Sequence, residues 1–153
     1  ASCLVGSEMC IRDRAMLERY FARYHQRLSD YLNDHQISYR QRVLDYYQQS
    51  LSFCQESSFA GCLSVKLSAE VCDLSEAMRS ALHAGSEALM ATLVKALMKA
   101  QQQGTLSAEI NCSQCAVTLY TLWLGASLQS KICRDNAPLL NAWQEMTRIL
   151  REA

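Results

Sequence analysis

Residues that break helices are scarce in this chain, and their scarcity limits the folds that it can adopt. Only one proline and five glycines occur among 153 residues, while half of the residues are hydrophobic. Tight turns and irregular loops depend on glycine and proline, so this composition favours helices joined by short connections. The length suits one compact domain with a sizeable core. We therefore expect an all-α fold.

Apolar residues recur at helical spacing along most of the chain and predict about six helices. The first three are expected at about Ala15–Asn33, Tyr39–Gln55 and Cys62–Cys72. Asp73 is expected to cap a long fourth helix, with Glu76 as its partner in a capping box. Gly104 fits the position just beyond the end of that helix.

Polar residues also mark the starts of the last two expected helices. Asn111, with Gln114 three residues later, resembles a capping box. The helix after it is apolar on nearly all sides over 117–128, which is typical of burial in a core or in a subunit interface. Asn136 and Pro138 begin the final helix, because proline is tolerated in a first turn.

The first fourteen residues, ASCLVGSEMCIRDR, have no helical period and little relation to the rest of the chain. The string resembles sequencing-adapter read-through, so we expect 1–14 to be non-native and 15–153 to form the domain. The alternative is a native N-terminal arm. Under the first interpretation Cys3 and Cys10 leave the cysteine count.

Charge and motifs exclude several classes of function. Fifteen basic and fifteen acidic residues give a net charge of zero, whereas a domain that binds nucleic acid alone carries a basic surplus. No apolar run approaches the roughly 20 residues that span a membrane. No secretory signal is visible, so the eight cysteines indicate a reduced, cytoplasmic protein rather than a disulfide framework. Known catalytic motifs are missing, so we expect no enzyme and no cofactor.

Three stretches resemble the regulatory half of tetracycline-repressor (TetR) family proteins. They are AMLERYFARYHQRL at 15–28, GCLSVKLSAEVCDLSEAMRSA at 61–81 and LYTLWLGASLQSKI at 119–132. The resemblance is weak over 97–115, and it is closest to a thiol-based sensor of reactive electrophiles and oxidants. It implies a homodimer in which the last two helices of each subunit form a four-helix bundle. The DNA-binding head would precede Ala15, so we expect a fragment that reaches operator DNA only through that missing domain.

The chemistry of such a sensor would lie on a cysteine, because a thiolate is a strong nucleophile. Cys62 is expected near the start of a short helix, where free backbone N–H groups favour an anion. Lys66, one turn on, adds positive charge. The resemblance places the sensing cysteine at Cys62. The alternative is a buried cysteine acting as a small hydrophobe.

Other residues are lesser candidates for sensing. Cys72 precedes the carboxylate of Asp73 and is expected to be structural. Cys112 and Cys115 form a CxxC pair at a helix start, where thiol pKa values can fall, and a dithiol switch is one interpretation of this pair. A second ligand pair is missing, so we expect no metal site. Lys131 would line the pocket, lower a thiol pKa or capture an oxidised sulfur, or else be an ordinary surface lysine.

The remaining predicted positions concern a pocket and an interface. The residues expected to line a ligand pocket are Tyr47, Lys66, Tyr120 and Trp123. Those expected in the dimer interface are Trp123, Leu128, Leu139, Trp143, Met146 and Leu150. The sequence thus favours a domain that senses a small electrophilic or oxidising effector. Two alternatives stay open, namely reversible binding of a hydrophobic ligand with inert cysteines and a purely structural dimerisation module.

Overall fold

The computed structural model describes residues 2–56, 70 and 72–153, and this part of the chain is helical without any strand. The expected all-α fold is therefore confirmed. The described helices are α1 (Ser2–Leu32), α2 (Tyr39–Glu56), α4 (Glu76–Gln102), α5 (Cys112–Cys133) and α6 (Ala137–Ile149). The short helix expected at 62–72 falls almost wholly outside the described residues.

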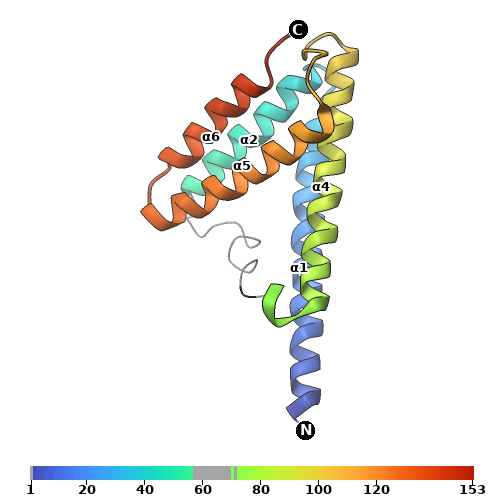
Figure 1. Ribbon diagram of the computed structural model, residues 1–153, viewed down its shortest axis with the longest axis vertical. Coiled ribbons are helices and arrows are strands. Elements are labelled where there is room, and N and C mark those ends of the chain that lie inside the picture. The colour runs from blue at the N-terminus through green and yellow to red at the C-terminus, as the bar shows by residue number, and fades with distance from the viewer. Residues whose placement is uncertain (1, 57–69, 71) are drawn as a thin grey trace.

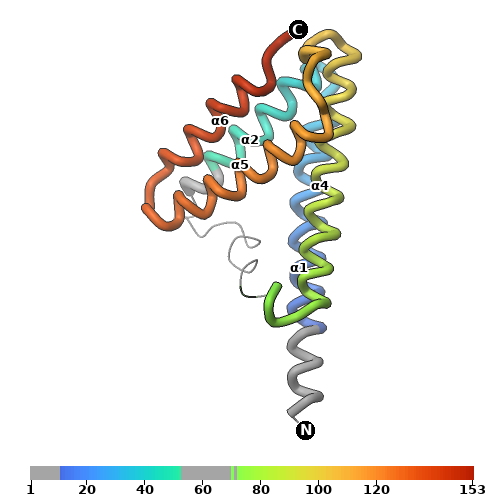
Figure 2. The backbone as a smooth tube through the Cα atoms, in the orientation of Figure 1, coloured from blue at the N-terminus to red at the C-terminus, as the bar shows by residue number. Residues whose placement is uncertain are grey.

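The helices form two groups (Figures 1 and 2). The long helices α1 and α4 lie side by side and run in the same direction, and the N-terminal end of α1 extends beyond α4. The other three helices, α2, α5 and α6, form a slanted layer beside the upper half of this pair. Helix α6 packs on both α2 and α5, while α2 and α5 each pack on α4. The core therefore lies where the slanted group meets the long pair.

Helix α1 begins much earlier than the sequence predicts, at Ser2 rather than near Ala15. Residues 1–14 lack an amphipathic period, but they also lack proline. Extending an existing helix costs far less than nucleating one, so the helix that packs on α4 continues into this segment.

The start of α4 also corrects the prediction. Its N-cap is Ser75, not Asp73, and the Ser75 side chain accepts a hydrogen bond from the backbone N–H of Met78. Asp73 lies in the helical turn before Ser75, so its backbone is not extended as an N-cap requires. At the other end Gly104 has φ +70°, just beyond the C-cap Gln103, which confirms its predicted role.

The starts of α5 and α6 match their predicted positions. Asn111 caps α5, and its side chain accepts a hydrogen bond from the N–H of Gln114 at 3.0 Å. Asn136 occupies the N-cap of α6 with Pro138 in the first turn, but the side chain of Asp135 accepts the hydrogen bond from the Ala137 N–H instead. Arg134 ends α5 with φ +52°, a left-handed conformation that turns the chain into α6.

A buried arginine joins α1 to α2. Arg42 is only 3% exposed. Its guanidinium donates 2.6 Å hydrogen bonds to the carbonyls of Leu32 and Ile37, and it stacks 4.1 Å from the ring centre of Tyr39. The first of these carbonyls is at the C-terminal end of α1 and the second is in the connection to α2, so Arg42 provides donors to acceptors on both sides of the junction. No described helix is long and apolar enough to cross a membrane.

Candidate functional site

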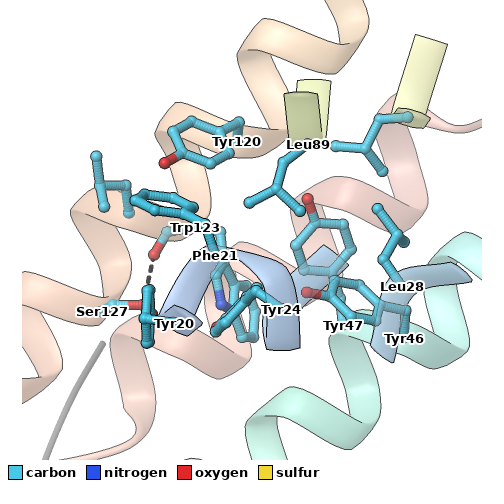
Figure 3. A pocket seen from close by; sticks show the side chains of 12 residues that line it. Tyr20, Phe21, Tyr24, Leu28, Tyr46, Tyr47, Leu89, Tyr120, Trp123 and Ser127 are labelled. Atoms are coloured by element: carbon cyan, nitrogen blue, oxygen red, sulfur yellow. Dashed lines mark hydrogen bonds between the residues drawn. The ribbon is translucent and has the colours of Figure 1, made fainter. Parts of the chain in front are cut away.

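A cavity lies where α1, α2, α4 and α5 meet, and aromatic side chains form most of its wall (Figure 3). Its empty volume, including the open mouth, is about 490 Å³. Much of this space is open solvent at the mouth, so the enclosed part of the cavity is small. The lining residues are Tyr20, Phe21, Tyr24, Leu28, Tyr46, Tyr47, Leu89, Leu93, Tyr120, Trp123, Leu124 and Ser127.

The rings contact one another in a continuous series across three helices. Tyr24 of α1 meets Tyr46 of α2 edge to face, with ring centres 6.4 Å apart. Tyr46 meets Tyr47 at 5.3 Å, and Tyr47 meets Trp123 of α5 at 5.1 Å. Edge-to-face and tilted pairs are favourable arrangements for aromatic quadrupoles. The series therefore holds α1, α2 and α5 in register around the cavity.

The described residues of the cavity wall carry no charge. Tyr47 is buried, and burial raises the pKa of its phenol far above the ordinary value. The hydroxyl of Ser127 is engaged by the carbonyl of Trp123, to which it donates at 2.7 Å. A site of this kind suits an apolar or aromatic molecule better than an ion, because an ion would lose its hydration without gaining a partner.

Sequence reasoning identified part of this cavity. The predicted residues Tyr47, Tyr120 and Trp123 come together there, whereas Lys66 lies outside the described residues. Phe21 was missed, although it lies on the same helix as two of the lining tyrosines. The sequence feature that could have pointed to Phe21 was Gly85 in the long helix, because a helical glycine marks a place where another side chain approaches closely.

The predicted sensing residue Cys62 lies outside the described residues. Cys72 is exposed in the turn before α4, and Cys133 is exposed at the end of α5. Lys131 is half-buried in the last turn of α5, four residues after the cavity residue Ser127 and so on the same helical face. The side chain of Lys131 makes no ion pair within the described part of the chain.

The CxxC pair does not have the lowered pKa values that its position at a helix start suggested. Cys112 and Cys115 are both buried. Burial raises the pKa of Cys112, and it raises the pKa of Cys115 to about 11. The Cys112 thiol also donates a hydrogen bond to Oε1 of Gln101 at 3.2 Å. Desolvation outweighs the helix terminus here, so burial disfavours the thiolate form of both cysteines.

The residues expected in a dimer interface divide into two sets. Leu139, Met146 and Leu150 are at most 1% exposed within the single chain, so they have no surface to offer a second one. Trp123 lines the cavity, and the indole N–H of Trp143 donates to the carbonyl of Leu44 at 3.3 Å. Of the expected set, Leu128 is the large exposed hydrophobic residue.

A stripe of exposed apolar side chains runs along α5 on the face opposite its buried one. Val117, Leu128 and Ile132 are 48%, 46% and 65% exposed, and Leu140 of α6 is 45% exposed. The apolar stretch 117–128 is therefore not buried all round within one chain. Exposed apolar stripes of this kind are typical of interaction surfaces.

Comparison with known proteins agrees with the helical architecture. Residues 40–146 match the family described as tetracyclin repressor-like, C-terminal domain. The chain is 50% identical over 137 residues to the HTH-type transcriptional repressor NemR of Escherichia coli K12, covering 89% of this chain and 69% of that protein.

Solved structures give the same result. The reduced form of E. coli NemR superposes with a TM-score of 0.80 at 47% identity, covering 91% of this chain and 72% of that one. A regulatory protein TetR from Rhodobacter sphaeroides shares the fold with a TM-score of 0.83 at 23% identity, covering 89% of this chain and 72% of that one. The chain therefore belongs to the TetR family of transcriptional regulators, as a C-terminal domain of that family.

Proposed function

We propose that this chain is the effector-sensing and dimerisation domain of a transcriptional repressor that responds to reactive electrophiles or oxidants. The observation that carries the proposal is the 50% identity to the repressor NemR over 89% of the chain. The burial of Cys112 and Cys115 supports it indirectly, because burial raises the pKa of both thiols and disfavours their reactive thiolate forms. A repressor has to reach DNA, which agrees with the cytoplasmic location expected from the sequence.

In this proposal Cys62 is the residue that reacts. Its thiolate adds to an electrophilic carbon of a quinone or an aldehyde, or is oxidised to a sulfenic acid by hypochlorous acid. Lys131 follows the cavity residue Ser127 by one helical turn on α5, and in this proposal its amine stabilises the thiolate or captures an oxidised sulfur. Cys72, which is exposed, is the second candidate after Cys62.

Transmission to DNA would pass through α1. Four cavity residues, Tyr20, Phe21, Tyr24 and Leu28, belong to this helix, so a change in the cavity acts directly on it. Packed cores switch between discrete arrangements rather than deforming continuously. A shift of α1 would alter the spacing of two DNA-binding heads, which has to match two operator half-sites.

The dimer would form through the exposed stripe on α5 and its neighbour on α6. Val117, Leu128, Ile132 and Leu140 supply the apolar contacts in place of the buried Leu139, Met146 and Leu150. Gly125 lies beside the stripe with open space around it, so a partner helix is free to approach closely.

Thiol mapping tests the proposal directly. The reduced, folded chain is treated with substoichiometric N-ethylmaleimide at neutral pH, digested, and analysed by mass spectrometry. We expect adducts at Cys62 well ahead of Cys72 and Cys133, which are exposed internal controls. Labelling in simple order of exposure, with Cys62 spared, contradicts thiol sensing at this residue.

The aromatic cavity favours a second candidate function, reversible binding of an apolar ligand. Its uncharged, largely aromatic wall suits a small aromatic molecule without any thiol chemistry. This function predicts saturable binding of a naphthalene-type probe that survives Cys62→Ser unchanged. Binding that disappears when Cys62 is replaced instead supports the covalent mechanism.

A further inference from the structure

A second groove lies away from the aromatic cavity, where the C-terminal end of α1, the first turn of α2 and the later half of α4 meet. It is open to solvent, with an empty volume of about 490 Å³. Unlike the cavity, its wall includes charged and polar side chains beside apolar ones. The lining residues are Ser29, Leu32, Asn33, Tyr39, Thr92, Lys95, Ala96 and Lys99.

Positive charge gathers at this groove, and none of the described residues that line it is acidic. Two cations lie close to the ring of Tyr39, with Arg42 at 4.1 Å and the Lys99 ammonium at 4.9 Å from its centre. Lys95 lies one turn before Lys99 on the same helical face. Within the described part of the chain, Arg42, Lys95 and Lys99 form no ion pair.

Acidic side chains near the groove are engaged elsewhere. Asp30 accepts a hydrogen bond from the Gln26 side chain at 2.8 Å, and Asp34 accepts one from the Gln36 N–H at 3.0 Å. The Ser29 carbonyl at the end of α1 accepts a hydrogen bond from the Asn33 N–H, and the Leu32 carbonyl accepts one from the Arg42 guanidinium. These carbonyls at the C-terminal end of α1 already accept hydrogen bonds, which reduces the negative partial charge that a bound anion would meet.

One of the cations is already fixed in position. The Lys99 ammonium donates a hydrogen bond to the Tyr39 hydroxyl at 3.2 Å, so less side-chain freedom is lost when it binds a ligand. The same hydrogen bond lowers the pKa of Tyr39, which makes its own O–H a stronger donor. The Ser29 hydroxyl and the Asn33 amide add further donors at the rim.

We propose that this groove binds a small organic anion through a phosphate or carboxylate group. Lys95 and Lys99 would supply the ionic contacts, and the Tyr39 hydroxyl would supply a charge-assisted hydrogen bond. The ligand would bridge α4 to the junction of α1 and α2 and so stabilise the position of α1. The site is independent of thiol chemistry, because no cysteine is among the described residues that line it.

Isothermal titration calorimetry on the intact chain tests the site, with inorganic phosphate and succinate as probes and chloride at matched ionic strength as the control. We expect saturable heat with one or both oxyanions. The Lys95→Gln/Lys99→Gln variant should bind about tenfold more weakly or worse, because it loses two charge-assisted contacts. Tyr39→Phe keeps the ring and removes only the hydroxyl, so it should weaken binding severalfold.

The matched control is Arg19→Gln/Arg148→Gln, which removes two positive charges from exposed positions outside the groove. It should bind the probes like the unaltered chain. Binding of phosphate alone or of succinate alone supports the site and assigns the class of ligand. The proposal is overturned if neither oxyanion gives saturable heat, or if both double variants weaken binding equally, since the effect is then one of net charge. Circular dichroism checks that each variant is folded.

Discussion

The ring of Phe21 in α1 lies directly on Gly85 in α4, so closely that a Cβ atom at position 85 would overlap it. Phe21 also lines the aromatic cavity. One side chain is therefore shared by the cavity wall and by the crossing of the two long helices. Any molecule or adduct that displaces this ring also displaces α1 relative to α4.

Replacing Gly85 with alanine should destabilise the chain. The added methyl group forces the Phe21 ring or the α4 backbone to move, which typically costs about 1–3 kcal/mol. That cost exceeds the gain of about 1 kcal/mol that alanine brings to a helix interior. Urea unfolding followed by circular dichroism measures the change. The control is Gly125→Ala, where nothing lies within 4 Å in the single chain, so the substitution should be neutral or stabilising when unfolding is measured at a protein concentration too low for dimers. Equal effects of the two substitutions would contradict the close packing.

Arg42 should contribute more to stability than any exposed arginine. Arg42→Gln removes two charge-assisted hydrogen bonds to the Leu32 and Ile37 carbonyls and leaves these acceptors at the α1–α2 junction unpaired. We expect a loss of about 3 kcal/mol in the free energy of unfolding. Arg148→Gln, which breaks an exposed ion pair with Glu145, should change it by less than about 1 kcal/mol. Denaturant unfolding of the two variants measures both changes in the free energy of unfolding.

Alkaline pH should destabilise the chain through Cys115. Burial raises the pKa of this thiol from an ordinary 9.0 to about 11. A thiol whose pKa is higher in the folded state than in the unfolded state contributes its full stabilisation of the fold below the unfolded-state pKa. This contribution is lost as the pH rises through the folded-state pKa. The free energy of unfolding, measured with urea at a series of pH values, should therefore fall between about pH 9 and pH 11. Cys115→Ala should flatten this fall, whereas Cys133→Ala, at an exposed thiol, should leave it unchanged.

Association should depend on the exposed stripe of α5. Leu128→Asp places a charge on that stripe and should shift the chain from dimer to monomer in sedimentation velocity, without unfolding it. Met98 on α4 is 49% exposed, close to the 46% of Leu128, so Met98→Asp is a matched control for surface charge. It should leave the sedimentation coefficient unchanged. A chain that is monomeric before any substitution would rule out pairing through this stripe.

The sequence predicts the helices and several of their ends because these depend on local interactions. Asn111 and Gly104 are recognisable from neighbouring residues alone, and both occupy their predicted positions. Asp73 was mistaken for a cap because Ser75, two residues later, can make the same hydrogen bond. A choice between neighbouring caps depends on where the backbone becomes extended, which tertiary packing determines.

Periodicity shows that a helix has an apolar face but not which surface covers it. The spacing of Leu139, Met146 and Leu150 is the same whether they meet α5 and α2 of their own chain or a second subunit. The structure places them in the chain's own core. The burial of Arg42 could not be predicted from the sequence. Arginine is usually a surface residue, and only the fold brings together the carbonyls that Arg42 binds.

The side chain of Gln101 links α4 to the loop before α5 and to Cys112 of the CxxC pair. Its amide donates to the carbonyls of Ser107 and Ile110 at 2.9 and 2.8 Å, while its oxygen accepts from the Cys112 thiol. A reagent reaches Cys112 only when this loop detaches from α4. The rate at which Cys112 is alkylated therefore measures how often the loop opens, since local unfolding must come first. Cys112 can therefore serve as a chemical probe of motion in the connection between α4 and α5.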